Sequence, residues 1–270
     1  MKRIFNIIIF IALSSGMVFL FVFANLKQKE LVCGEFIIDI DYNGAPPLIN
    51  NSTIRREITR SGLRIKNQPV ASIKAPQLQQ LLKSNPYVKK ATISVSVNGV
   101  VKANILQRNP IVRVVDREYN QCLLDDEGHM MPVNIEFPVR LVLATGNINN
   151  LKKASAKTGA SNAPSTRVRY QPARTSNLPS DLSDIHKVAL KLEADTLTSA
   201  LIEQIYINSE KEIELIPKIG EQSIIMGDTV LIDHKLRNLR VFYDHGMKNF
   251  AWNNYKVINL KYKNQVVCSK

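Results

Sequence analysis

The chain has 270 residues, of which 45% are hydrophobic, and a formal net charge of +13. Its three cysteines, Cys33, Cys122 and Cys268, are too few and too widely spaced for a disulfide framework. A small disulfide-stabilised secreted domain is therefore excluded, and we expect ordinary hydrophobic cores. A pI of about 9.7 is typical of nucleic-acid-binding proteins, but the chain has an apolar N-terminus and no basic helix with interleaved aromatic residues. We expect no nucleic-acid partner.

An uncharged apolar run of 23 residues occupies positions 4–26. As a helix it would be about 35 Å long, enough to cross a hydrocarbon core of about 30 Å with some tilt. Lys2 and Arg3 precede the run, whereas charges of both signs follow it. The positive-inside rule then places residues 1–3 in the cytoplasm and residues 27–270 on the other side of the membrane. We expect a single membrane-inserted helix.

A cleaved signal peptide is the alternative interpretation of this run. Residues 22–24 (V-F-A) carry small side chains at the positions that a signal peptidase inspects, but the run is about twice the usual length of roughly 7 to 15 residues. Cys33 is a weak candidate for a lipoprotein cysteine, because Lys27, Lys29 and Glu30 separate it from the apolar run. A retained anchor is favoured over both.

The segment after the anchor predicts a small α+β domain. Residues 36–42 alternate apolar and acidic side chains, the pattern of a half-buried strand, and Asn98-Gly99 between two alternating runs is a strong hairpin signal. Two amphipathic helices lie between the strands, so we expect both on one face of a sheet. The expected elements are a strand at 36–42, a helix capped at 51–53 and closed at Gly62 with Leu63 on its apolar face, a helix at 75–83, and strands at 88–97 and 100–106.

The remainder predicts a mixed β domain with flanking helices. Short apolar or alternating runs, separated by polar turns, are typical of strands, and two longer segments have helical periodicity. The strands are expected at 111–115, 121–124, 138–143, 205–207, 213–216, 223–226, 256–262 and 265–268. The helices are expected from the cap at Ser180-Asp181 to Leu192, and over 229–245 with Gly246 as the C-terminal cap.

Residues 147–180 interrupt this pattern. The stretch is rich in Asn, Ser, Ala and Pro, has no periodicity, and contains six basic residues and no acidic one. Such a composition is typical of a disordered insertion. One interpretation is a contact for anionic lipid or cell-wall polymer, and the simpler one, which we favour, is a tolerated solvated loop.

The sequence contains no recognisable catalytic motif, so we expect no enzyme, no cofactor, no metal site and no small-molecule substrate. Its histidines are dispersed, and we expect them at the surface or at helix ends. They are His129, His186, His234 and His245. The acidic turn Asp125-Asp126-Glu127 has the chemistry to hold a cation, although acidic turns without an ion are commoner.

Five short motifs stand out along the chain. They are N-P-Y-V-K-K-A at 85–91, Q-R-N-P-I at 107–111, L-L-D-D-E-G-H-M at 123–130, F-P-V at 137–139 and I-N-L-K-Y at 258–262. In this order they resemble the P-x-V-x-x-A, E-R-x-P-x-A, L-I-D-x-x-G-x-V, L-P-x-L and I-D-L-R-Y motifs of the bacterial cell-division family FtsQ/DivIB. Gln107 replaces the usual acid of the second motif, and Asn259 and Lys261 replace the Asp and Arg of the last.

The resemblance implies a domain order and a function. The domains would be a cytoplasmic start at 1–3, a transmembrane helix at 4–26, a juxtamembrane segment at 27–35, a POTRA domain at 36–107 and a β domain at 108–270. The protein would be a non-enzymatic scaffold of the divisome in the cytoplasmic membrane, at the division septum. It would link early and late division proteins and bind the bitopic partners FtsB and FtsL, or proteins like them.

The C-terminal strand is the expected partner-binding element. A chain that ends in a strand can leave that strand at the edge of a sheet, where an extended segment of another protein can pair with it. Tyr255, Val257 and Tyr262, with Trp252 upstream, offer apolar anchors, or else they are simply core residues. The resemblance implies that the binding residues are Tyr262, Asn264, Gln265, Val266, Val267 and Cys268. It leaves open whether a salt bridge forms at positions 259 and 261.

Two alternative functions are also considered for this sequence. A membrane-anchored envelope enzyme would need converging acids or a metal site. Another POTRA-type envelope assembly protein would share the first domain but not the C-terminal motifs.

Overall fold

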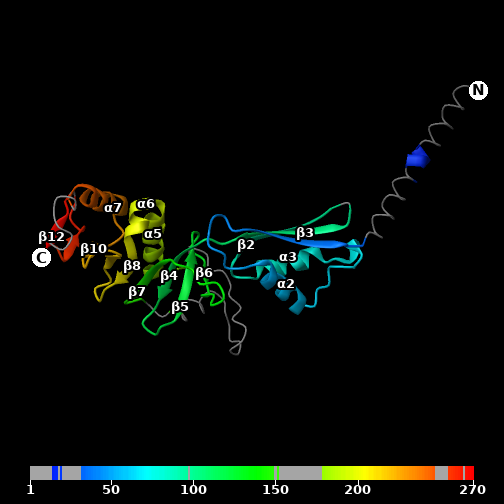
Figure 1. The fold of residues 1–270 in the computed structure, drawn as a ribbon, viewed down its shortest axis with the longest axis horizontal. Coiled ribbons are helices and arrows are strands. Elements are labelled where there is room, and N and C mark those ends of the chain that lie inside the picture. Colours follow the sequence, from blue (N-terminus) through cyan, green and yellow to red (C-terminus); the bar gives the residue numbers. More distant parts are fainter. Residues whose placement is uncertain are drawn as a thin grey trace, which may run out of the picture. The chain divides into compact units, whose positions relative to one another are not determined.

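The computed structural model describes residues 14–17, 19, 32–96, 98–148, 151, 178–246, 255–263 and 265–270 (Figure 1). The predicted helix 4–26 therefore lies almost entirely outside the described residues, as do Trp252 and Asn264. None of the helices in the described part is long and apolar enough to cross a membrane. The chain divides into two compact units. The N-terminal unit is Met1–Asp41, Ile49–Lys83 and Val88–Gln107, and the C-terminal unit is Tyr42–Leu48, Ser84–Tyr87 and Arg108–Lys270.

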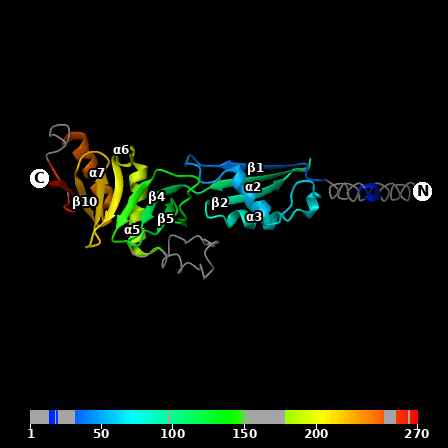
Figure 2. The same ribbon diagram turned by 60° about the horizontal axis from the view of Figure 1, so that its bottom comes forward.

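The N-terminal unit is a three-stranded sheet in the order β1-β3-β2, with helices packed along it (Figure 2). The central strand β3 pairs parallel with β1 and antiparallel with β2, which leaves β1 at one edge. The predicted order of strand, helix, helix, strand, strand is confirmed. The elements are β1 (Glu35–Asp41), α2 (Asn51–Arg60), a 3₁₀ turn (Val70–Ser72), α3 (Ala75–Lys83), β2 (Val88–Val95) and β3 (Val100–Gln107).

Helix α2 begins one residue earlier than the sequence predicts. The Asn50 side chain accepts from the Thr53 backbone N–H at 2.8 Å, and Thr53 Oγ1 accepts from the Asn50 N–H at 3.0 Å, which forms a capping box. The chain leaves the helix at Gly62, whose φ of +79° suits a residue without Cβ. Leu63, expected on the apolar face, therefore lies beyond the helix. Ile54 and Ile58 form that face, and both are buried.

The β2–β3 hairpin is confirmed, but its loop is longer than two residues. Strand β2 ends at Val95, and the Ser96 N–H donates to the Val100 carbonyl at 2.8 Å. Gly99 has a φ of +80°, and a Cβ there would lie 2.7 Å from the Val32 carbonyl oxygen. The turn thus needs glycine for its conformation and for close approach to another backbone segment.

The C-terminal unit contains a nine-stranded sheet in the order β12-β11-β10-β9-β8-β7-β4-β5-β6. Strand β7 pairs parallel with both neighbours, so the sheet is mixed. The strands are β4 (Pro110–Val115), β5 (Gln121–Asp125), β6 (Met130–Met131), β7 (Val142–Gly146), β8 (Ile202–Ile207), β9 (Ile213–Pro217), β10 (Ser223–Gly227), β11 (Val257–Asn259) and β12 (Val267–Ser269). The helices are α5 (Ser180–Ala194), α6 (Thr196–Leu201), α7 (Ile232–Val241) and a π-helical turn, η3 (Phe242–Gly246).

Several predicted boundaries in this unit are wrong. The strand predicted at 138–143 begins at Val142, after Pro138, which has no N–H for a ladder. The helix predicted from 229 begins at Ile232, because Leu231 has a left-handed backbone with φ +53°. The strand predicted at 256–262 is only Val257–Asn259.

The core of the C-terminal unit extends into the segment predicted as the basic insertion. Ile148 and Leu151 are 2% and 4% exposed and pack among the strand and helix side chains of the core. The Leu151 N–H donates to Asp116 Oδ2 at 2.9 Å. The six basic residues of the predicted insertion lie between 152 and 177, outside the described residues.

Candidate functional site

The last strand of the chain lies at one edge of the nine-stranded sheet. Strand β12 pairs antiparallel with β11, with Cys268 opposite Ile258 and Val267 opposite Asn259. Strand β11 in turn pairs parallel with β10. Among the described strands β12 has no second neighbour, so it is an edge strand of the sheet that the structure describes.

The side chains of this edge alternate between the core and solvent. Val266 and Cys268 are half-buried and pack against the core, whereas Gln265 and Val267 are exposed, Val267 at 41%. Tyr262, in the turn that precedes the strand, is 51% exposed. Of the six predicted residues, two pack on the core, three are exposed, and Asn264 lies outside the described residues.

Cys268 lies close to a buried tyrosine. Burial raises the pKa of the Cys268 thiol. Burial, with a smaller contribution from Cys268, raises the pKa of Tyr243 to about 12. A thiol with a raised pKa is protonated at neutral pH and is a poor nucleophile. Cys268 thus serves this edge as a packing side chain.

A salt bridge does form at the corner that precedes β12. The Lys261 ammonium pairs with the Glu212 carboxylate, and this hydrogen bond raises the pKa of Lys261. Asn259 Oδ1 accepts from the Lys261 N–H at 2.9 Å, and the Leu260 N–H donates to the Ile225 carbonyl at 2.8 Å. The question left open by the Asn and Lys replacements is therefore answered: the ion pair is present, with Glu212 as the acid.

The aromatic anchors expected around the edge differ in exposure. Tyr255 and Val257 are half-buried, which agrees with the simpler interpretation of core residues, and Trp252 lies outside the described residues. Tyr262 is the one described member of the set that presents a largely exposed surface.

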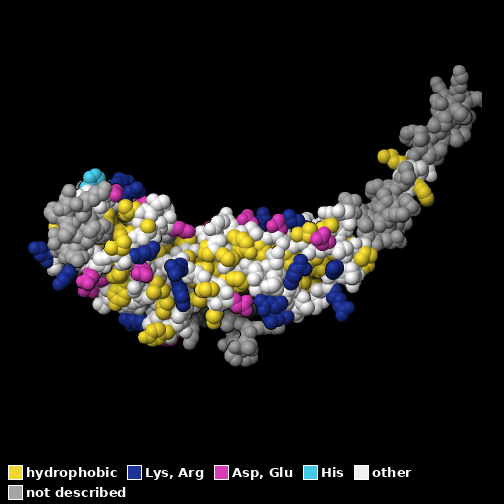
Figure 3. Space-filling model, in the orientation of Figure 1, with side chains coloured by type: hydrophobic (Ala, Val, Ile, Leu, Met, Phe, Trp, Pro, Cys, Tyr) yellow, Lys and Arg dark blue, Asp and Glu magenta, His cyan; other side chains and the backbone are white. Residues whose placement is uncertain are grey.

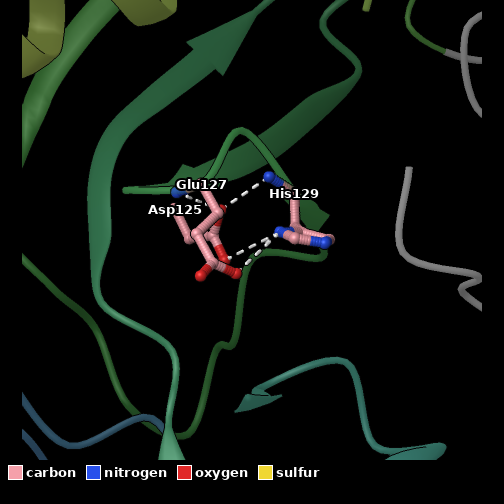
Figure 4. A group of neighbouring side chains, drawn as sticks. All are labelled: Asp125, Glu127 and His129. Carbon is pink, nitrogen blue, oxygen red and sulfur yellow. Dashed lines mark hydrogen bonds and ion pairs between the residues drawn. The ribbon is translucent and has the colours of Figure 1, made fainter. Parts of the chain in front are cut away.

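A second cluster joins two of the sequence motifs. Arg108, from the Q-R-N-P-I motif, places its guanidinium 2.8 Å from Asp125 Oδ2, in the L-L-D-D-E-G-H-M motif, and both side chains are buried. Asp125 Oδ1 accepts from the N–H groups of Glu127 at 3.0 Å and His129 at 2.6 Å (Figure 4). Arg108 and Asp125, which are 17 positions apart in the sequence, thus connect the two motifs through a buried ion pair.

The same cluster answers whether the acidic turn is a cation site. Ligand atoms of Asp125, Glu127 and His129 lie within 4.8 Å of one another, and His129 Nδ1 is 3.3 Å from Asp125 Oδ2. However, one oxygen of Asp125 already accepts two backbone N–H groups and the other pairs with Arg108. A cation would have to displace the buried Arg108 guanidinium from Asp125. The carboxylate of Asp125 therefore stabilises the turn through hydrogen bonds and an ion pair.

The expectation that all histidines lie at the surface or at helix ends is wrong for His186. This residue is 5% exposed, and its Nε2 lies 3.0 Å from the Asp125 carbonyl oxygen. The signal was present in the sequence, because His186 lies four residues after Leu182 and three before Ala189, both buried on the apolar face of α5.

Two models of known protein families match this chain. Residues 31–106 match the model of the POTRA-like domain, and residues 109–269 match the model of the FtsQ/DivIB, C-terminal related domain, which covers more than half of the chain. The chain belongs to the FtsQ/DivIB family. No curated protein matches the sequence.

Family membership gives the coarse function. FtsQ/DivIB proteins are non-enzymatic, membrane-anchored proteins of cell division, and they act with other proteins of the divisome at the septum. The boundary between the two matches, at residues 106–109, agrees with the end of β3 at Gln107, although residues 42–48 and 84–87 of the POTRA-like match belong to the C-terminal unit.

Proposed function

We propose that this FtsQ/DivIB protein is a scaffold of the divisome, linking early and late division proteins. A single helix over residues 4–26 anchors it in the cytoplasmic membrane, with residues 1–3 in the cytoplasm. Residues 36–107 form a POTRA domain for recruitment, and residues 108–270 form a β domain for partner binding. The 23-residue uncharged run and the basic residues before it support this topology.

The β domain binds FtsB-like and FtsL-like bitopic proteins by strand addition at β12. The observation that carries this part is the position of β12 at the end of the sheet order, next to exposed Val267 and Tyr262. Main-chain hydrogen bonds from an added strand supply affinity, and the neighbouring side chains supply specificity. Tyr262 is suited to be an anchor, since exposed tyrosines at interfaces often dominate the binding energy.

A binding assay with matched variants tests the edge. The double variant Tyr262→Ala/Val267→Asp removes the aromatic anchor and places a carboxylate beside the free backbone edge. We expect it to weaken binding to the FtsB-like and FtsL-like ectodomains by at least about thirtyfold, the usual effect of losing a hot-spot residue.

The control makes the same chemical changes elsewhere on the β domain. Tyr119 and Ile219 are 84% and 65% exposed and lie in other turns of the unit. Tyr119→Ala/Ile219→Asp should bind like the wild type. Equal affinity of the two double variants, with unchanged circular dichroism, would rule out the edge as the binding element.

A separate experiment tests the anchor. We expect the full chain to stay with the membrane pellet after alkaline carbonate extraction, and externally added protease to digest residues 27–270 in spheroplasts. Release of the full-length chain by carbonate would show that residues 4–26 do not span the bilayer.

A further inference from the structure

The N-terminal unit carries a groove next to its exposed strand β1. The groove has a volume of about 820 Å³ and lies between the start of β1, the C-terminal half of α2 and the loop that follows α2. Phe36, Ile58 and Leu63 contribute its apolar surface. Helix α2 contacts β1, which is an edge strand of this sheet, so the groove lies at that edge.

Basic side chains line this groove. Arg55, Arg64 and Lys66 contribute to its wall, against a single acid, Glu35. Arg55 donates to the Phe36 carbonyl at 3.1 Å, and its guanidinium lies 5.9 Å from the centre of the Phe36 ring. The space-filling view shows Lys and Arg side chains next to hydrophobic ones over this unit (Figure 3). We call this set of residues the basic groove.

Two cations of the basic groove form no ion pair with any residue that the structure describes. Arg64 and Lys66 are exposed, and neither forms an ion pair in the described part of the chain. Elsewhere on the same unit Lys102 pairs with Asp39 at 2.8 Å. Neighbouring unpaired cations repel one another, so this surface favours an anionic ligand.

The basic groove lies at the end of the unit where the chain arrives from the apolar run. The Cys33 N–H donates to the Gln68 carbonyl at 2.8 Å, and the Asn67 N–H donates to the Cys33 carbonyl at 2.9 Å. These bonds hold the loop of Arg64 and Lys66 against Cys33, two residues before β1 begins. Residue 32 is six residues after the apolar run ends at position 26, so at most about 22 Å of extended chain separates them.

We propose that the basic groove binds the phosphate groups of anionic phospholipids in the outer leaflet of the cytoplasmic membrane. Arg64 and Lys66 contact the phosphates, and the half-buried Leu63 faces the apolar boundary of the headgroup layer. The inference rests on the membrane anchor of the proposed function, since the tether brings the groove within reach of that layer. The contact orients the POTRA domain on the membrane surface.

The test uses the full chain in nanodiscs. One set contains phosphatidylcholine alone and the other contains about a third phosphatidylglycerol, with amide hydrogen exchange measured over residues 62–69. We expect roughly tenfold slower exchange in the anionic discs and loss of this protection at high salt, because salt screens the phosphate charges.

A charge-reversed pair and a matched control locate the effect. Arg64→Glu/Lys66→Glu should abolish the protection. Lys83→Glu/Lys90→Glu should retain it. Both control lysines are exposed. Lys90 lies at the end of the sheet opposite Glu35, because its partner in β3 is Leu106, which on its other side pairs with Asp41 at the far end of β1.

The other outcomes are distinct. Equal exchange in both lipids would overturn the inference while leaving the anchor intact. Protection that is absent in anionic discs but appears on adding an acidic partner ectodomain would assign the basic groove to a protein ligand instead. Failure of the chain to enter nanodiscs would overturn the anchor, and with it this inference.

Discussion

One carboxylate, that of Asp116, joins two segments of the β domain, its own turn at 116–120 and residue 151. Its Oδ1 accepts from the N–H groups of Glu118 at 2.9 Å and Asn120 at 2.8 Å, and its Oδ2 accepts from the Leu151 N–H. Burial alone would raise the pKa of this carboxyl, but the hydrogen bonds from Asn120, Leu151 and Glu118 together lower it. The folded chain therefore favours the ionised form.

This shift predicts acid sensitivity. Because the pKa of Asp116 is lower in the folded than in the unfolded chain, its stabilisation is complete above the ordinary value of 3.8 and is lost as the pH falls through the folded value. We expect Asp116→Asn to be less stable than the wild type at pH 7, by about 1–3 kcal/mol, and the difference to shrink below about pH 4. Urea unfolding at several pH values measures it. A difference independent of pH would contradict the assignment.

The ion pair between Arg108 and Asp125 yields a second prediction at this scale. Arg108→Met would leave a buried carboxylate without its cation, which typically costs about 3–5 kcal/mol. Thermal unfolding of the variant should show a large loss of stability, whereas Arg117→Met, at an exposed arginine, should change little. A small effect at Arg108 would mean that the backbone N–H groups alone satisfy Asp125.

Residue identities in the sequence anticipated part of this chemistry. Arg108 and Asp125 each stood in a recognisable motif, but their pairing was not predictable because nothing local links positions 17 apart. The Lys261 ion pair was missed for the same reason, since Glu212 lies 49 residues away.

At the scale of elements, predictability depended on local periodicity. Helix α3 begins and ends where its apolar spacing and Pro76 predict, whereas α6, with only six residues, offers too few turns for a period. The strands at the C-terminus are shorter than their apolar runs, because pairing with a neighbour, and not composition, determines where a strand ends.

Leu231 shows how an element boundary can be engineered. Its φ of +53° is unfavourable for a residue with a branched side chain, and the residue is 52% exposed at the start of α7. Leu231→Asn should stabilise the β domain by about 0.5–1 kcal/mol, because Asn adopts the left-handed region more readily than Leu. The midpoint of thermal unfolding measures this. Val230→Asn, at the exposed neighbouring position, should give no gain; if it stabilises equally, the backbone explanation fails.

At the scale of the whole molecule, each compact unit is built from several separate stretches of the sequence. Leu48 is fully buried in a cluster with Leu123 and Met131, and the Tyr87 hydroxyl donates to the Pro132 carbonyl at 3.2 Å, all within the C-terminal unit. Short segments from early in the chain therefore complete a core formed mainly by later ones. Sequence reasoning could not detect this, because Leu48 lies in an irregular segment with no period.

The arrangement predicts a long-range effect of one early residue. Leu48→Ala should destabilise the C-terminal unit by about 2–5 kcal/mol, the range for Leu to Ala in a core. Amide exchange of β5 should accelerate accordingly. Leu63→Ala, at a half-buried position of the N-terminal unit, should leave β5 unchanged. Unaltered exchange of β5 in Leu48→Ala would place Leu48 outside that core.

The parallel pairing of β7 with β8 has a practical use. Two parallel neighbours need a long crossover, and α5 and α6 already supply one between them. In the sequence, residues 152–177 fall between β7 and α5, outside the segments that form β12 and β6. A fluorescent protein inserted in that stretch would mark the molecule in dividing cells while leaving both terminal strands of the sheet unmodified.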